Sequence, residues 1–133
     1  MRLYSVAVAS LAIDAPSKWT DNLIAHHVIP DVRSQNRGVA RGVSWAGLVR
    51  IALIRELHVA LGCGVRDAVA LSDVLLQSPA GHLKVGRWST VAFDRRALEQ
   101  DLQHRLAEAL ESAPRPRRGR PARRAVSSGP PRD

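Results

Sequence analysis

The sequence predicts a mainly α-helical fold with a small β-wing, and three observations support this prediction. Aliphatic residues recur at helical spacing in five segments, and glycine or proline separates these segments. Residues 31–43 are polar and contain three arginines and two glycines, a composition typical of a basic β-hairpin or loop. Only 4% of the 133 residues are aromatic, so aliphatic side chains must build the core. This length suits one domain and a tail.

The first two predicted helices are short. Residues 4–13 begin with Ser5 as a plausible N-cap, although a strand remains open over so few residues. The second helix is expected over about 16–26, with a cap at Asp14 or Ala15. A short extended segment, residues 28–30, leads from it into the basic stretch.

The next helices carry the clearest apolar pattern. Ser44 is the predicted N-cap of a helix that runs to about Leu61, where Gly62 stops it. A further helix is expected over about 65–77. Residues 82–93 then predict a short hairpin centred on Gly86 and Arg87.

The last predicted helix begins after Asp94, which caps it, and runs to about Ser112. It carries a stripe of leucines spaced four residues apart: Leu98, Leu102, Leu106 and Leu110. Such a stripe covers one face of a helix, and we expect it to pair two chains. The alternative is packing on the hairpin within one chain. The chain thus divides into residues 1–77, residues 78–113 and a tail, residues 114–133.

The net charge of +8 is concentrated in the tail, which contains seven arginines and one acidic residue. With almost no apolar residue, residues 114–133 are predicted to be disordered alone. This asymmetry indicates a polyanionic partner, and nucleic acid is favoured over a membrane because the tail has no large hydrophobic residue to insert. A single cysteine and the lack of an apolar run of membrane-spanning length predict a cytoplasmic, nucleoid-associated protein.

Several short motifs together resemble one known family. They are Tyr4-Ser5-Val6, Pro16-Ser17-Lys18-Trp19, Val28-Ile29-Pro30, Arg41 followed by Ser44, and the run VRIALIRELHVALG at 49–62. This order resembles the MerR-type winged helix-turn-helix, a superfamily that includes excisionase-like proteins. The resemblance covers residues 4–76 and implies a winged helix-turn-helix followed by a short hairpin and a C-terminal helix. It departs from the family at 19–21, where Trp-Thr-Asp replaces the usual arginine-aromatic pair.

The expected contacts with double-stranded DNA lie on the second helix and the basic stretch. The exposed polar face of a helix in the major groove reads base edges: Asn22 suits adenine, and Lys18 suits guanine or a phosphate. Near the helix N-terminus, phosphate contacts are expected from hydroxyl groups. The whole predicted set is Ser17, Lys18, Trp19, Thr20 and Asn22 on the helix, with Arg33, Arg37 and Arg41 reaching the DNA backbone or minor groove.

The tail contains a second candidate motif, Arg118-Gly119-Arg120-Pro121, preceded by Arg117. It resembles the core of an AT-hook. Glycine lets an extended backbone lie deep in a narrow minor groove, where flanking arginines meet strongly negative potential. The alternative is a generic basic tail with non-specific affinity.

These features predict a dimeric, sequence-specific DNA-binding transcriptional regulator. Two alternatives stay open: an excisionase-like DNA-bending factor, and an antitoxin-type module that binds a protein partner through 78–112 and regulates its own gene. No catalytic constellation or cofactor-binding motif is recognised. His26 and His27 with Asp31 are an incomplete metal-ligand pattern, so no metal site is expected.

Overall fold

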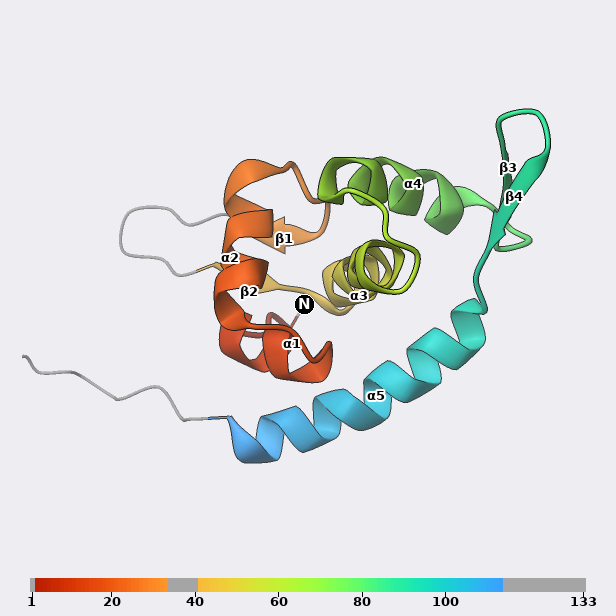
Figure 1. Ribbon diagram of the computed structural model, residues 1–133. Coiled ribbons are helices and arrows are strands. Elements are labelled where there is room, and N and C mark those ends of the chain that lie inside the picture. The colour runs from red at the N-terminus through yellow and green to blue at the C-terminus, as the bar shows by residue number, and fades with distance from the viewer. Residues whose placement is uncertain (1, 34–40, 114–133) are drawn as a thin grey trace, which may run out of the picture.

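The computed structural model describes residues 2–33 and 41–113, and it is mainly helical with two small antiparallel sheets (Figure 1). This confirms the expected fold class at that level. The helices are α1 (Val6–Ala12), α2 (Ser17–His26), α3 (Trp45–Val59), α4 (Val65–Gln77) and α5 (Arg95–Ser112). The strands are β1 (Val32–Arg33), β2 (Gly42–Val43), β3 (His82–Val85) and β4 (Ser89–Ala92).

Helix α3 is the centre of the core. Its buried side chains include Leu48, Ile51 and Ile54, none of which is exposed to solvent. The predicted N-cap is confirmed, because the Ser44 hydroxyl accepts a hydrogen bond from the Gly47 amide at 3.1 Å. The helix ends at Val59, slightly before the expected end at about Leu61. Residues 59–61 are all exposed, so no buried helix face extends into this segment.

Helix α1 forms where the local signals predict it, with the Ser5 hydroxyl accepting from the Val8 amide. The strand alternative is therefore wrong. The expected cap of α2 at Asp14 or Ala15 is also wrong, because Pro16 occupies the N-cap position without a side-chain hydrogen bond. Asp14 lies at φ +56°, and the amides of Asp14 and Ala15 donate to Leu11 and Ser10 carbonyls. Both residues thus close the turn after α1.

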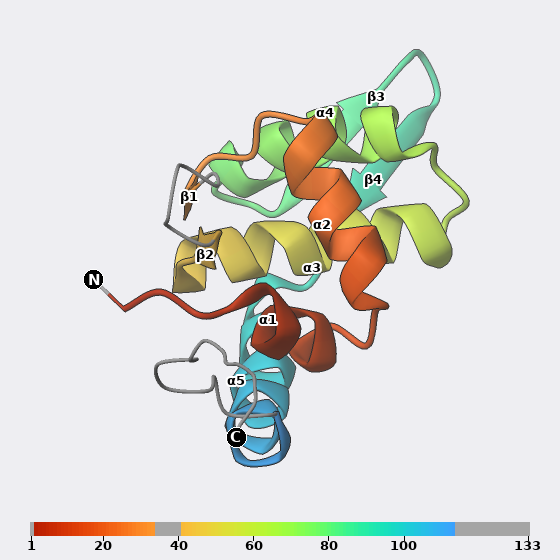
Figure 2. The same cartoon turned by 90° about the vertical axis from the view of Figure 1, so that its left-hand side faces the viewer.

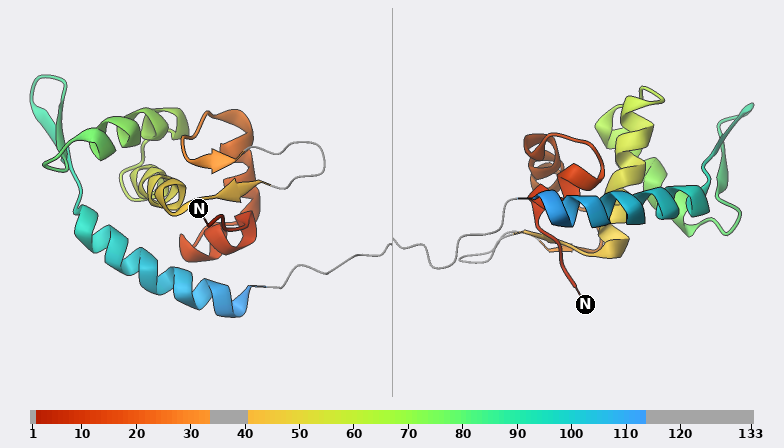
Figure 3. Two further views of the ribbon diagram at one scale, coloured as in Figure 1. Left: turned by 180° about the vertical axis from the view of Figure 1, so that it is seen from behind. Right: turned by 90° about the horizontal axis from the view of Figure 1, so that it is seen from below.

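Helix α5 packs along α1 and also contacts α3 (Figures 1 and 3). Leu102 and Leu106 are buried in the common core of one chain, so their predicted use in pairing two chains is wrong. Leu98 is half-buried against the same core, and only Leu110 is substantially exposed, at 40%. The stripe packs against α1 and α3 and not against the hairpin. The apolar face of a helix can be buried against any apolar surface, so its pattern alone does not specify the partner.

The predicted hairpin is confirmed as β3 and β4, which pair with Leu83 opposite Val91. Gly86 lies at φ +68° in the connecting turn, a backbone conformation that glycine adopts without steric cost. The hairpin projects from the helical body between α4 and α5 (Figures 1 and 3). Among the described helices, none is long and apolar enough to cross a membrane.

Candidate nucleic-acid interface

Helix α2 has two distinct sides. Thr20, Leu23 and Ile24 are its buried residues, as helical spacing requires for a helix that covers a core. The exposed side begins with Ser17 and Lys18 and continues to Asn22. Three of the five α2 residues expected to contact DNA therefore lie on one polar, solvent-facing arc.

Thr20 does not belong to that arc. Its side chain has no solvent exposure, and its hydroxyl oxygen accepts a hydrogen bond from the Ser10 hydroxyl at 2.8 Å. The expected phosphate contact from Thr20 is therefore wrong. The residue instead joins α2 to α1 inside the core, because a buried hydroxyl must find a partner and Ser10 supplies it.

Trp19 is half-buried, and α3 packs against its ring. The Arg55 guanidinium lies 4.8 Å from the centre of the indole ring, and the His58 ring stacks at 6.2 Å. Such cation–π and stacked contacts fix the orientation of a large side chain. Trp19 thus positions α2 on α3. The contributions of Arg55 and His58 were missed, although Trp19 falls on the apolar arc of α2.

The short β1–β2 pair, called the wing below, is held firmly beside the N-terminus of α3. Val32 pairs with Val43, and Val43 also exchanges backbone hydrogen bonds with Tyr4 at 2.7 and 2.9 Å. Ser44 donates to the Asp31 carbonyl at 2.8 Å, which joins the start of the wing to the N-terminus of α3. These contacts confirm that the basic stretch leaves and re-enters the body as an antiparallel pair.

An ion pair joins the wing to the exposed side of α2. Arg41 Nη1 lies 2.8 Å from Asp21 Oδ1, with the arginine side chain 22% exposed and the aspartate 48% exposed. A pair of this kind contributes at most about 1 kcal/mol to stability. Its larger consequence is geometric, since it places the wing beside the polar arc, as Figure 2 shows for α2 with β1 and β2. The sequence offered no signal that Asp21 is the partner of Arg41.

The remaining predicted contacts divide into two groups. Arg33 is on β1 with an exposed side chain, on the same wing as Arg41. Arg37 lies outside the described residues, and so do the hook residues of the tail, Arg117, Arg118, Gly119, Arg120 and Pro121.

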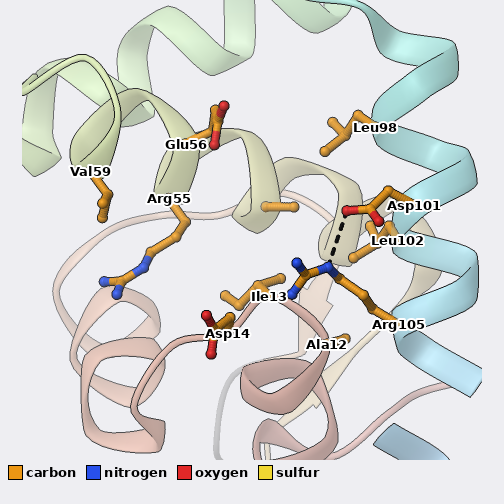
Figure 4. Close-up of a pocket in the computed structure, with 11 residues that line it drawn as sticks. Ala12, Ile13, Asp14, Arg55, Glu56, Val59, Leu98, Asp101, Leu102 and Arg105 are labelled. Carbon is orange, nitrogen blue, oxygen red and sulfur yellow. Dashed lines mark hydrogen bonds and ion pairs between the residues drawn. The ribbon is translucent and has the colours of Figure 1, made fainter. Parts of the chain in front are cut away.

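The described residues also form a cavity of about 320 Å³ between α1, α3 and α5 (Figure 4). Its charged lining is mixed and contains three acidic and two basic side chains: Asp14, Glu56, Asp101, Arg55 and Arg105. Asp101 is already paired with Arg105 at 3.1 Å. Across residues 2–33 and 41–113, no group of three or more potential metal ligands is present.

Comparison with known proteins gives no relative for this chain: no family model, no curated protein and no solved structure matches it.

Proposed function

We propose that this protein binds double-stranded DNA through α2 and the wing, in the manner of a winged helix-turn-helix regulator that resembles the MerR type. The observation that carries the proposal is the ion pair between Arg41 and Asp21. It brings the base of a basic hairpin beside the only face of α2 that is free of the core. A helix and a wing on one surface are the two elements that such a domain applies to adjacent grooves.

The dimensions and chemistry of α2 support this assignment. An α-helix is about 10–12 Å wide with its side chains, and the major groove of B-DNA is about 12 Å wide. Asn22 offers the paired donor and acceptor that read adenine, and Lys18 offers a donor for guanine or phosphate. Ser17 lies in the first turn, where a hydroxyl and the helix dipole favour a phosphate oxygen.

The charge of Asp21 would oppose a DNA backbone if it were uncompensated. Arg41 neutralises this carboxylate, so the net charge of the arc stays positive through Lys18. In this proposal the arginines of the tail supply affinity that depends strongly on salt, and the folded part supplies sequence preference.

The test is selection of bound duplexes from a random pool, run with the full chain and with residues 1–113. We expect one enriched motif shared by both, with weaker overall binding for the shorter chain. Asn22→Ala should lower affinity for the selected site by about tenfold to a hundredfold while leaving non-specific binding unchanged. Lys18→Ala should weaken binding, and Lys84→Ala, which removes an exposed lysine far along the chain on β3, is its matched control.

If neither chain enriches a motif and neither binds duplex at moderate salt, the proposed function is wrong. A motif that requires the tail would also contradict the assignment of base reading to α2. If Lys18→Ala and Lys84→Ala lower the affinity for DNA equally, α2 contributes only non-specific positive charge.

A further inference from the structure

The β3–β4 hairpin exposes an aromatic side chain that the described residues leave largely uncovered. Trp88 in the connecting turn is 88% exposed, and its indole carries only the Arg87 guanidinium at 5.4 Å from the ring centre. Leu83 and Val91 pack against the core, whereas Trp88 does not belong to that cluster. An isolated two-stranded hairpin is marginally stable in water, so a projecting one with an exposed tryptophan indicates an additional partner.

The two edges of this hairpin differ in charge. Strand β3 carries Lys84 and His82, and a lysine on an edge strand opposes pairing with another strand. Strand β4, with the sequence Ser-Thr-Val-Ala, has no charged residue and no proline. It follows that β4 is the edge open to a further strand.

The hydrogen-bond pattern identifies the backbone groups at that edge. The Phe93 amide donates to the Gly81 carbonyl at 3.0 Å, so in an antiparallel ladder the hydrogen-bonded positions alternate from there. Thr90 is opposite Lys84 at a position that is not hydrogen-bonded within the hairpin, and its N–H and C=O therefore point outward. Ala92 does the same. In the described part of the chain, the N–H and C=O groups of Thr90 and Ala92 have no other backbone hydrogen-bond partner.

We infer that β4 pairs antiparallel with β4 of a second copy of this chain, forming a four-stranded sheet across a two-fold axis. Residues that lie directly opposite each other in the paired β4 strands have their side chains on the same side of the sheet. Because side chains alternate between the two sides along a strand, the two-fold axis must pass beside a residue that lies opposite its own copy. With Thr90 at the centre, Thr90 meets Thr90 of the second copy, and Trp88 lies opposite Ala92. The exposed indole then covers a small side chain, and the outward backbone groups of Thr90 in the two copies pair with each other.

This arrangement is compatible with the proposed function but does not depend on it. The hairpin and α2 lie at opposite sides of the helical body (Figures 1 and 2), so pairing through β4 leaves both copies of the α2 arc open. It also replaces the leucine stripe of α5, which is buried within one chain, as the dimer contact.

The test is sedimentation velocity of the full chain without DNA, at concentrations up to about 0.1 mM because so short an edge buries less than a standard interface. We expect a monomer–dimer equilibrium. Thr90→Pro removes only an outward N–H and should raise the dimer dissociation constant by more than about tenfold. Lys84→Pro makes the same change on the β3 edge and should leave the dissociation constant unaltered.

A cross-link tests the register independently of any effect on folding. With Cys63→Ala as background, Thr90→Cys should form a disulfide-linked dimer, because Cα atoms in a hydrogen-bonded antiparallel pair lie about 5.5 Å apart, within disulfide range. Lys84→Cys should not. A wild-type chain that stays monomeric, or a dimer that Lys84→Pro weakens as much as Thr90→Pro, overturns the inference. A dimer that has no affinity for duplex DNA contradicts the proposed function alone.

Discussion

The protein presents two surfaces that project from the same core, and they are supported very differently. The α2 arc and the wing are held by side chains from α1 and α3, including a buried hydroxyl pair and a tryptophan covered on its ring face. The β3–β4 hairpin has its base on the core and its tip in solvent. The two tryptophans show this contrast: α3 packs against the ring of Trp19, whereas Trp88 is 88% exposed.

This difference indicates different tasks. A surface that reads base edges must hold its side chains in a defined geometry, and rigid elements provide that geometry. A projecting hairpin gains order only when a partner covers it. In the two proposals above, the first surface binds a rigid duplex and the second associates with another strand to complete a sheet.

The largest expected effect on stability concerns α5. This helix follows the hairpin and packs in the core, whereas the tip of the hairpin is exposed to solvent. Leu102→Ala should lower the free energy of unfolding by about 2–5 kcal/mol, because it leaves a cavity at a side chain that is 3% exposed. Leu110→Ala, on the same stripe but 40% exposed, should change it by less than about 0.5 kcal/mol. Urea denaturation measures both. Equal effects would contradict internal packing of the stripe.

A smaller loss of stability is expected from a substitution where β1 meets the N-terminus of α3. A Cβ atom at position 47 would lie 2.5 Å from the Asp31 carbonyl oxygen, which Ser44 already holds by a hydrogen bond. Gly47→Ala should therefore destabilise the protein by about 1–3 kcal/mol and weaken DNA binding through displacement of the wing.

Gly64→Ala is the matched control for that substitution, since no atom lies within 4 Å of the added methyl group. It should leave unfolding within about 0.5 kcal/mol of the wild type. If thermal denaturation gives both variants the same stability, the wing is less firmly seated than the contacts with Asp31 indicate.

The smallest effect on folding is expected at the tip of the hairpin. Trp88→Ala should alter the unfolding free energy of the monomer by less than about 0.5 kcal/mol, since the side chain is 88% exposed. The same substitution should weaken the dimer measurably by sedimentation. A large loss of monomer stability would mean that the indole is covered within its own chain, and the contrast between the two regions would fail.

Much of the secondary structure was predictable because its signals are local. Ser5, Ser44 and Asp94 each cap the helix expected of them, and each does so by accepting an amide hydrogen bond from three residues further along the chain. The turn at Gly86 is local in the same sense. The cap of α2 failed as a prediction because Asp14 was already used in closing the preceding turn.

The candidate site was only partly predictable. Ser17, Lys18 and Asn22 lie on an exposed arc as expected, because helical periodicity alone separates the two sides of α2. The burial of Thr20 depends on Ser10, which is ten residues earlier, and the position of the wing depends on Asp21, twenty residues before Arg41. No local pattern specifies such partners.

By itself the sequence determined that these helices and turns form, where three of the helices are capped, which side of each helix is apolar, and that positive charge gathers at 114–133. Those properties follow from backbone hydrogen bonding, allowed dihedral angles and side-chain chemistry within a few residues. Only the tertiary structure decided that the leucine stripe of α5 covers α1 and α3, that Trp19 is an anchor and that the hairpin tip stands uncovered. An apolar face gains the same free energy on any complementary surface, so its partner is set by the packing of the whole chain.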